Sequence, residues 1–398
     1  MSEMSYLEKL LDGVEVEWLS LSKVFNLRNG YTPSKTKKEF WENGDIPWFR
    51  MDDIRENGRI LGNSLQRISS CAVKGGKLFP ENSILISTSA TIGEHALITV
   101  PHLANQRFTC LALKESYVDC FDIKFLFYYC FSLAEWCRKN TTMSSFASVD
   151  MDGFKKFLIP LPCPDNPEKS LAIQSEIVQI LDKFTALTAE LTAELTARKK
   201  QYNYYRDRLL SFEEGEVEWK TLGEVAVIGT GNHDTQDAIE HGKYIFYARG
   251  REPLKLNVFD FDETAIITAG DGAGVGKVFH YAKGKYALHQ RAYRIVPNAF
   301  MNPRFVYHYI TAYFFTYIQK ASVSSSVTSL RRPMFLKFPI PVPPSEEQAR
   351  IVEILDKFDT LTNSITEGLP REIELRQKQY EYYRDLLFSF PKPETVSN

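Results

Sequence analysis

At 398 residues the chain is long enough for two domains of ordinary size, each with its own core. Hydrophobic residues make up 44% and charged residues 25% of it, as in an ordinary globular protein, and the net charge is −2. No run of roughly 18 apolar residues occurs, which excludes a membrane-spanning helix. The most apolar stretch, residues 121–137, contains three charged residues and favours a buried aromatic helix instead.

The N-terminus and the cysteines favour a reducing compartment. The first residues lack the basic-then-apolar pattern of a signal peptide. All six cysteines lie in the first half of the chain and form no CxxC pair: Cys71, Cys110, Cys120, Cys130, Cys137 and Cys163. We therefore expect buried thiols in the bacterial cytoplasm, with no disulfide or zinc framework.

Four motifs occur twice along the chain, and they divide it into two copies. The first and second occurrences are EVEW at 15–18 and 216–219, FLIPLP at 157–162 and FPIPVP at 338–343, ILDKF at 180–184 and 354–358, and QYxYYRD at 201–207 and 379–385. Between the first two motifs each copy carries an insert that shares little with the other. A duplicated scaffold with two different inserts suggests one kind of partner held twice and two different things recognised.

Charge follows the same division. Residues 15–160 hold 18 Lys and Arg against 16 Asp and Glu, and residues 216–343 hold 15 against 11. Residues 165–214 hold 7 against 9, and residues 344–398 hold 7 against 11. The inserts are therefore basic and the segments that follow them acidic, a pattern that fits inserts facing DNA on a scaffold facing protein.

The two scaffold segments predict long helices. Apolar residues recur at three- and four-residue steps from Ile173 to Phe212 and from Ile351 to Phe390. We expect Ser170 to cap the first helix, and Ser345 with Gln348 to form a capping box at the second. Two helices with matching stripes most simply pack as an antiparallel pair.

The two helices differ between the ILDKF and QYxYYRD motifs. The first has a direct repeat of Thr-Ala-Glu-Leu at 188–191 and 192–195, which adds about 6 Å of helix and indicates a spacer. The second has Gly368 and Pro370 in the corresponding stretch, which predict a kink or break.

Both inserts predict a mixed α/β fold in one common order. Strands are expected at 83–88, 108–113, 265–268 and 293–296, aromatic helices at 123–138 and 303–320, and serine-rich loops at 141–148 and 322–329. Shared order with different connecting segments indicates one fold with different surface loops.

No catalytic motif is found. Residues 271–277 (DGAGVGK) lack the first glycine and the final Ser or Thr of a phosphate-binding loop, so they predict a tight turn. No adenine-methyltransferase run, nuclease acid cluster or H-x3-H pair occurs. The sequence indicates a chain that is not an enzyme.

The order insert, helix, insert, helix, with both helix motifs repeated, resembles the specificity subunit of type I restriction-modification systems over essentially the whole chain. The duplicated helices and the TAEL repeat resemble the type IC subfamily in particular. The resemblance implies an α+β protein with two mixed α/β target recognition domains joined by two long antiparallel helices as a coiled coil, in a circular pseudo-twofold arrangement. It divides the chain into an N-terminal segment with the first recognition domain (1–162), a central helix (163–214), the second recognition domain (215–343) and a C-terminal helix (344–398).

The resemblance also implies partners. A specificity subunit binds double-stranded DNA with a bipartite site, holds two modification subunits that methylate adenine N6, and works with restriction subunits that translocate and cut DNA. S-adenosylmethionine, ATP and Mg²⁺ then belong to those partners, and none is expected in this chain.

Polar and basic side chains in the inserts are the candidate DNA contacts, because Arg and Lys bind phosphate and Arg and Gln bind base edges. In the first insert they are Asn29, Tyr31, Thr32, Ser34, Lys35, Lys37, Lys38, Arg50, Arg55, Arg59, Gln106 and Arg107. In the second they are Asn232, His233, Tyr247, Arg249, Arg251, His289, Gln290 and Arg291. The candidate partner contacts are Tyr202, Tyr204, Tyr205, Arg206, Tyr380, Tyr382, Tyr383 and Arg384.

Two alternatives stay open at this point. A coiled-coil adaptor with two protein-binding domains would explain the duplication but not the basic inserts. A stand-alone methyltransferase or nuclease with a degenerate motif would bind its own cofactor.

Overall fold

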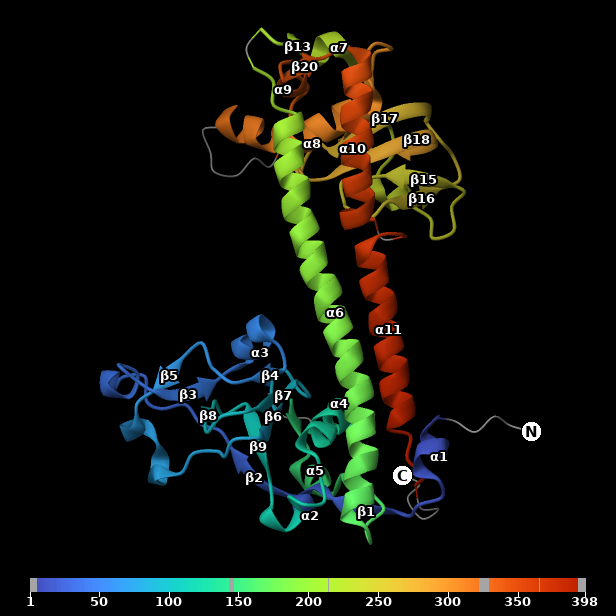
Figure 1. Ribbon diagram of the computed structural model, residues 1–398. Coiled ribbons are helices and arrows are strands. Elements are labelled where there is room, and N and C mark those ends of the chain that lie inside the picture. Colours follow the sequence, from blue (N-terminus) through green and yellow to red (C-terminus); the bar gives the residue numbers. More distant parts are fainter. Residues whose placement is uncertain (1–5, 143–146, 214, 322–328, 365, 393–398) are drawn as a thin grey trace, which may run out of the picture. The chain divides into compact units, whose positions relative to one another are not determined.

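A computed structural model describes residues 6–142, 147–213, 215–321, 329–364 and 366–392 (Figure 1). The chain forms two compact units, one of residues 1–189 with 375–398 and one of residues 190–374. The division falls within the TAEL repeat and within the last helix, so each unit takes part of each long helix. The four segments expected from the sequence divide the chain differently and stay a prediction.

The first unit holds the first insert with parts of α6 and α11. Its elements are α1 (Tyr6–Leu11), β1 (Val16–Ser20), α2 (Leu21–Val24), β2 (Phe25–Asn29), β3 (Ile46–Phe49), α3 (Met51–Asn57), β4 (Ile60–Leu61), β5 (Arg67–Ile68), β6 (Ser83–Ser87), β7 (His95–Ile98), β8 (Leu103–Ala104), β9 (Phe108–Leu113), α4 (Ile123–Lys139), β10 (Thr141–Thr142), β11 (Ser148–Val149), α5 (Met151–Lys156), β12 (Leu158–Pro162), α6 (Pro167–Leu209) and α11 (Leu369–Leu387).

The second unit holds the second insert with the rest of those helices. Its further elements are β13 (Glu218–Thr221), α7 (Leu222–Val225), β14 (Ala226–Thr230), β15 (Tyr244–Tyr247), β16 (Leu254–Leu256), β17 (Phe261–Ala269), β18 (Phe279–Leu288), β19 (Ala292–Pro297), α8 (Pro303–Ala321), α9 (Arg332–Leu336), β20 (Pro339–Val342) and α10 (Ser345–Asn363). The expected strands and aromatic helices are confirmed within a residue or two, apart from β17, which is longer. Among the described residues no helix is long and apolar enough to cross a membrane.

The repeated motifs that flank each insert pair with each other. In the first unit β1 is antiparallel to β12, with Trp18 opposite Pro160. In the second unit β13 is antiparallel to β20, with Trp219 opposite Pro341. These residues hold the same places in their motifs, so each insert begins and ends at a two-stranded ladder of identical register.

The sheets show that the two inserts share one fold. Antiparallel strands follow in the order β2-β9-β6-β7 in the first unit and β14-β19-β17-β18 in the second. The three-stranded sheet β5-β3-β8 matches β16-β15 and the end of β18, because β3 pairs in parallel with β8 as β15 does with β18. The long β18 therefore takes the places of both β7 and β8, so the second insert has one sheet where the first insert has two. Strand β4 and helix α3 lie in the first insert alone among the described parts.

The aromatic helix of each insert packs against the scaffold helices of its own unit. In the first unit the contacts in order along α4 are Asp122 with Gln174, Phe125 with Phe388, Tyr128 with Asp182 and Phe131 with Tyr380. The numbers rise along α6 and fall along α11, so these two helices are antiparallel there, as expected. In the second unit Figure 1 shows α10 running antiparallel to the last part of α6, and α8 occupies the place of α4.

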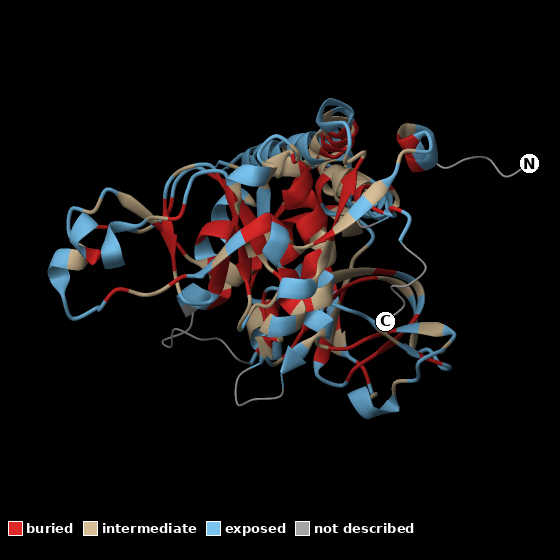
Figure 2. Ribbon diagram, turned by 90° about the horizontal axis from the view of Figure 1, so that it is seen from below, coloured by how far each residue is buried: buried red, intermediate tan, exposed pale blue. Residues whose placement is uncertain are grey.

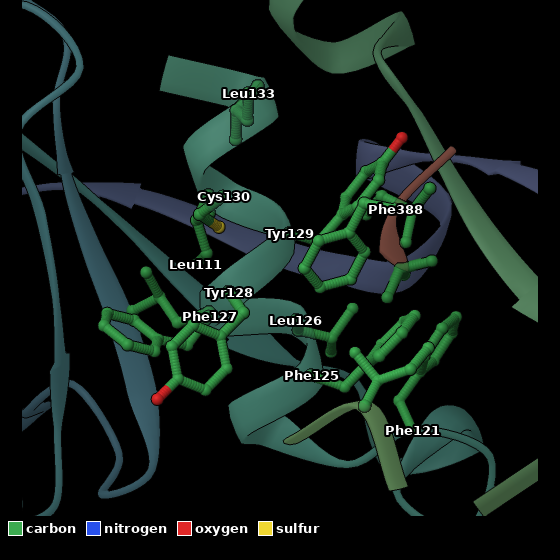
Figure 3. Close-up of a cluster of buried hydrophobic side chains, with 14 of the residues drawn as sticks. Leu111, Phe121, Phe125, Leu126, Phe127, Tyr128, Tyr129, Cys130, Leu133 and Phe388 are labelled. Atoms are coloured by element: carbon green, nitrogen blue, oxygen red, sulfur yellow. The ribbon is translucent and has the colours of Figure 1, made fainter. Parts of the chain in front are cut away.

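The first and last described segments contribute to the core of the first unit. Figure 3 shows Phe388 lying against Tyr129 of α4, with ring centroids 5.4 Å apart. Leu7 and Leu11 of α1 belong to the same buried cluster. The segment after α11 and the N-terminal helix therefore contribute to one core, in keeping with the circular arrangement expected. Buried residues lie on strands and packed helices, while the projecting loops are mostly exposed (Figure 2).

The helix caps expected from the sequence are wrong. Helix α6 begins at Pro167, and Ser170 lies buried inside it, where its hydroxyl accepts from the Gln174 amide. Helix α10 has no side-chain cap, and Gln348 instead turns inward. It accepts from the Asn302 backbone N–H at 2.7 Å, and Gln174 accepts from Asp122 at 2.9 Å. Both glutamines therefore hydrogen-bond the start of an aromatic helix to the scaffold. At Gln348 these tertiary partners replace the capping interaction that was expected.

Three further expectations have mixed outcomes. The break before Pro370 is confirmed, since α10 ends at Asn363 and α11 begins at Leu369. The six cysteines are free, but Cys71 is exposed, and Cys120 and Cys163 are only partly buried. Residues 143–146 and 322–328 of the serine-rich loops lie outside the described residues.

Candidate nucleic-acid interface

Each insert builds one particular turn, which we call the glutamine–arginine turn, between β8 and β9 in the first unit and between β18 and β19 in the second. It spans Asn105–Arg107 in the first unit and His289–Arg291 in the second. The Asn105 side chain accepts the Arg107 backbone N–H at 3.0 Å, and His289 Nδ1 accepts that of Arg291 at 2.9 Å. Different residues thus fold the two turns alike, and Gln106 and Gln290 hold matching places, as predicted.

A glycine loop crosses each glutamine–arginine turn at very close range. A Cβ on Gly30 would lie 2.1 Å from the Asn105 carbonyl oxygen, and one on Gly231 would lie 1.9 Å from that of Leu288. Only glycine permits such an approach of two backbones. The loops at 30–35 and 231–233 are thereby brought beside residues 105–107 and 288–291, a juxtaposition that the sequence prediction did not include.

The first unit gathers most of its predicted residues around one cavity of about 640 Å³. Its lining comprises Thr32, Lys35, Lys38, Trp41, Glu42, Trp48, Arg50, Met51, Asp52, Arg55, Gln66, Asn105, Gln106 and Arg107. Thr32 is hydrogen-bonded to Gln106. Among the described residues Arg107 has no side-chain partner, so its guanidinium at the rim is free to bind a ligand.

Aromatic residues that the sequence reasoning missed form the wall of this cavity. Trp41 and Trp48 meet edge to face with ring centroids 5.0 Å apart, and Arg50 lies over Trp48 at 5.9 Å. Gln66 and Asn105 were missed as well. The sequence did carry a signal for this aromatic wall, because Trp41 and Trp48 lie between the predicted basic residues Lys38 and Arg50.

Other predicted residues of the first insert do not line this cavity and instead contact other parts of the protein. The Tyr31 hydroxyl donates to the Ala72 carbonyl oxygen at 3.0 Å, which fixes it as a packing residue. Asn29 accepts from Thr109, Ser34 bonds to Thr36, and Lys37 covers the Phe40 ring. Arg59 lies apart from the cavity and pairs with Glu94 at 2.9 Å.

The second unit surrounds its turn with carboxylates. Asp271 accepts from Arg249 at 2.9 Å and from Arg291 at 3.1 Å, so one carboxylate holds two of the predicted arginines. Burial opposes ionisation, but these two hydrogen bonds keep the pKa of Asp271 below its ordinary value. Asp234 accepts from the Gln290 amide at 2.9 Å. Here the glutamine–arginine turn is fixed, whereas in the first unit its arginine is free.

Three other predicted residues of the second insert are structural in this fold. Tyr247 is buried, and burial raises its pKa. His289, the first residue of the turn, is buried, and burial lowers its pKa. His233 lies 3.1 Å from the Asp260 carboxylate. Asn232 and Arg251 are exposed and remain available.

The QYxYYRD motif has one conformation in both units. Tyr205 stacks on Phe358 at 5.6 Å and 25°, and Tyr383 stacks on Phe184 at 5.3 Å and 24°. Arg206 pairs with the neighbouring Asp207, and Arg384 pairs with Asp385, at 2.7 Å in both cases.

Exposure divides the predicted partner contacts. Tyr204 and Tyr382 are 59% and 65% exposed, unusually open for large aromatic residues. Tyr380 is only 9% exposed and Tyr202 is partly buried, because both face the core of their own unit. The exposed face of the motif is therefore the part that a partner could contact.

The described residues also bear on metal and thiol chemistry. Among them, no group of three or more His, Cys, Asp or Glu side chains could hold a metal ion. Burial raises the pKa of the Cys110 and Cys137 thiols to about 12, which makes them poor nucleophiles.

The protein carries one fold twice on a repeated helical scaffold. Each copy has a different surface around the same glutamine–arginine turn. The sequence matches the family described as the type I restriction modification DNA specificity domain over residues 13–198 and 214–375. The chain therefore belongs to the specificity subunits of type I restriction-modification systems.

Relatives agree with this assignment. The chain is 66% identical over 378 residues to the type I restriction enzyme EcoprrI specificity subunit of Escherichia coli, covering 92% of this chain and 93% of the relative. It is 42% identical to the EcoR124I/EcoR124II specificity subunit of the same species, over the full length of both. These names give no subfamily, so the type IC assignment stays a prediction.

Solved structures share the fold. The type I restriction-modification S subunit from M. genitalium has a TM-score of 0.59 at 18% identity, covering 98% of this chain and 100% of that one. A structure described as the basis of complex assembly and conformational transition of the type I system has a TM-score of 0.57 at 16% identity, covering 94% and 97%. At these identities the likeness concerns the fold alone.

Proposed function

We propose that this chain reads a bipartite DNA target, with one half-site bound by each insert. The observation that carries the proposal is the glutamine–arginine turn, which has the same backbone in both units but different surroundings. Arg107 is free beside a polar, tryptophan-lined cavity, whereas Arg291 is fixed with Arg249 by Asp271. Arg binds guanine and Gln binds adenine in the major groove, and their fixed or free geometry decides which base edge fits.

The chain acts, in this proposal, as a non-catalytic subunit that positions enzymes. Two modification subunits would bind the exposed faces of the two QYxYYRD motifs, because two copies of one motif offer two like sites to one kind of partner. They would bring S-adenosylmethionine and methylate adenine N6 in each half-site. Restriction subunits would add ATP- and Mg²⁺-dependent cleavage away from the site, all in the bacterial cytoplasm.

The decisive experiment maps N6-methyladenine in DNA from cells that express this chain with its cognate modification subunit. We expect a two-part motif with a fixed gap that is absent without this chain. Arg107→Ala should relax one half of the motif and Arg291→Ala the other, each leaving the opposite half as its internal control. An assembled complex that produces no motif would favour the protein-binding adaptor instead.

The partner surface is tested by stoichiometry. Tyr204→Ala combined with Tyr382→Ala should reduce the number of modification subunits bound per chain, measured by the mass of the complex. Phe300→Ala is the matched control, because this aromatic side chain is 49% exposed and lies outside the motif. Full stoichiometry in the double variant would mean that another surface holds the partners.

A further inference from the structure

A basic pocket lies beside the turn between β17 and β18, next to the glutamine–arginine turn but not part of it. The turn, residues 270–278, and the segment 249–251 enclose a cavity of about 530 Å³. Three cations and one carboxylate line it, namely Arg249, Arg251, Lys277 and Asp271. The glycine-rich run that fails as a nucleotide-binding loop therefore forms one wall of a cationic pocket.

Glycines make this wall thin. A Cβ on Gly274 would lie 2.7 Å from the Arg249 carbonyl oxygen, and Gly272 has a φ of +81° with open space around it. Gly276 also has a positive φ, and its Cβ would lie 2.5 Å from the Ile318 side chain. The close approach at Gly274 therefore holds the turn against segment 249–251, and at Gly272 the bare backbone borders the pocket beside the charged side chains.

The charge balance favours an anion. Asp271 is already held by Arg249 and by Arg291, which lies outside the pocket. Among the described residues Arg251 and Lys277 have no carboxylate partner. Lys277 lies over the Phe315 ring with its nitrogen 5.0 Å from the centroid, which keeps its ammonium group beside the turn. The lining carries a net charge of +2.

The first unit has a pocket in the matching place. The turn between β6 and β7 and helix α3 enclose about 510 Å³, with Arg55, Arg59, Arg138 and Glu94 in the lining. Arg59 pairs with Glu94, which leaves Arg55 and Arg138 and again a net charge of +2. Thr91 lines this pocket too, and its hydroxyl is buried without a hydrogen-bond partner.

The two pockets have the same net charge but are lined by different residues. Arg138 comes from the end of α4, whereas Lys277 comes from the turn itself. In both units the last residue of the serine-rich segment, Ser148 or Ser329, forms a β-bridge to this turn, at Ser89 or Asp271 respectively. A similar charge at one place, built from unrelated residues, indicates a ligand whose chemistry is the same in both halves.

We propose that each pocket binds a phosphodiester group of the DNA backbone and so anchors its recognition domain, independently of the bases that the glutamine–arginine turn reads. The inference rests on the proposed function. A phosphate is the one group that two different half-sites present alike, and contacts to it fix register without carrying sequence information. Arg249 links the two features, since it lines the pocket and shares Asp271 with Arg291.

The test uses the full chain assembled with its modification subunit, and two duplexes, one with the mapped site and one without it. Arg251→Gln with Lys277→Gln should weaken binding to both duplexes by a similar factor, roughly 3–10-fold per lost contact. The slope of log affinity against log salt should become shallower by about 0.9 per contact. The methylation motif should not change. Lys283→Gln, an exposed lysine of the same unit outside the pocket, is the matched control.

A second measurement locates the contact. Replacing single phosphates by neutral methylphosphonates should weaken the wild-type complex at one position in that half-site and have no further effect on the Lys277→Gln variant. Arg138→Gln should do the same in the other half-site. An unchanged salt slope, or a changed motif, would overturn the phosphate assignment while wild-type recognition of the site persists. Failure of the wild type to prefer its site would instead overturn the proposed function.

Discussion

Gln348 should stabilise the second unit out of proportion to its size. Its side chain is 1% exposed and serves three backbone groups. It accepts from the Asn302 N–H at 2.7 Å and donates to the carbonyl oxygens of Pro343 at 2.9 Å and Phe300 at 3.2 Å. It thus joins the start of α10 to the start of α8, so Gln348→Ala releases the joint between scaffold and insert.

The magnitude follows from those three bonds. Each hydrogen bond contributes about 1 kcal/mol net, and a buried group left unpaired costs about 1–3 kcal/mol. We expect Gln348→Ala to lower the free energy of unfolding of the second unit by about 2–4 kcal/mol. For a unit of this size, that corresponds to a fall in melting temperature of roughly 6–12 °C at the middle of the range.

Calorimetry of the full chain measures the loss, and hydrogen exchange of the α8 and α10 peptides assigns it to the second unit, since two units need not unfold together. Gln201→Ala is the matched control, because Gln201 is exposed in the same unit and only accepts from Arg198. Gln348→Met keeps the volume without the hydrogen bonds and should stay destabilised. A fully stable Met variant, or an Ala variant no weaker than the control, would refute the argument.

Other predictions concern the turn, the pH dependence and the spacer. Gly231→Ala places a Cβ 1.9 Å from the Leu288 carbonyl oxygen and should destabilise the second unit by about 1–3 kcal/mol and weaken the recognition of one half-site. Gly250→Ala, whose Cβ has 4.0 Å of clearance, should be stable in the same thermal unfolding assay. Burial lowers the pKa of His95 to about 3, so the unfolded chain binds a proton that the folded chain refuses between pH 6.5 and 3. Stability of the first unit should therefore be complete above pH 6.5 and fall by up to about 1.4 kcal/mol per pH unit below it. His95→Phe should flatten this slope in unfolding titrations, and an unchanged slope would assign it to other groups. A third TAEL copy should lengthen α6 by about 6 Å and widen the gap of the methylation motif while both half-sequences stay the same. A gap that does not move would mean that the repeat is no spacer.

Much of the fold was predictable because local patterns carried it. The apolar stripes set the long helices, and the aromatic runs gave α4 and α8 almost to the residue. Duplication predicted the two copies of one fold, whereas the pairing of the flanking motifs as β1–β12 and β13–β20 was not predicted and comes from the structure. The break before α11 followed from Gly368 and Pro370, which act through their own backbone.

The candidate site was predictable only in outline. The matching places of Gln106 and Gln290 could be aligned from sequence, but their surroundings come from segments far apart in the chain. Asp271 lies 20 residues before Arg291, and nothing local marked it as the residue that holds that side chain. The same holds for the pairing of Asp234 with Gln290 across 56 residues.

Sequence by itself determined the scaffold helices, the aromatic helices and four of the strands, because those choices depend on neighbours within a few positions. Tertiary structure decided which side of each element is covered. Residues 380 and 382 lie on opposite faces of one helix, and only the packing of α4 buries Tyr380 and leaves Tyr382 open. It also placed Gln348, the expected cap residue, in the core, where it bonds the Asn302 backbone N–H, since a buried backbone N–H must find a partner wherever the chain can supply one.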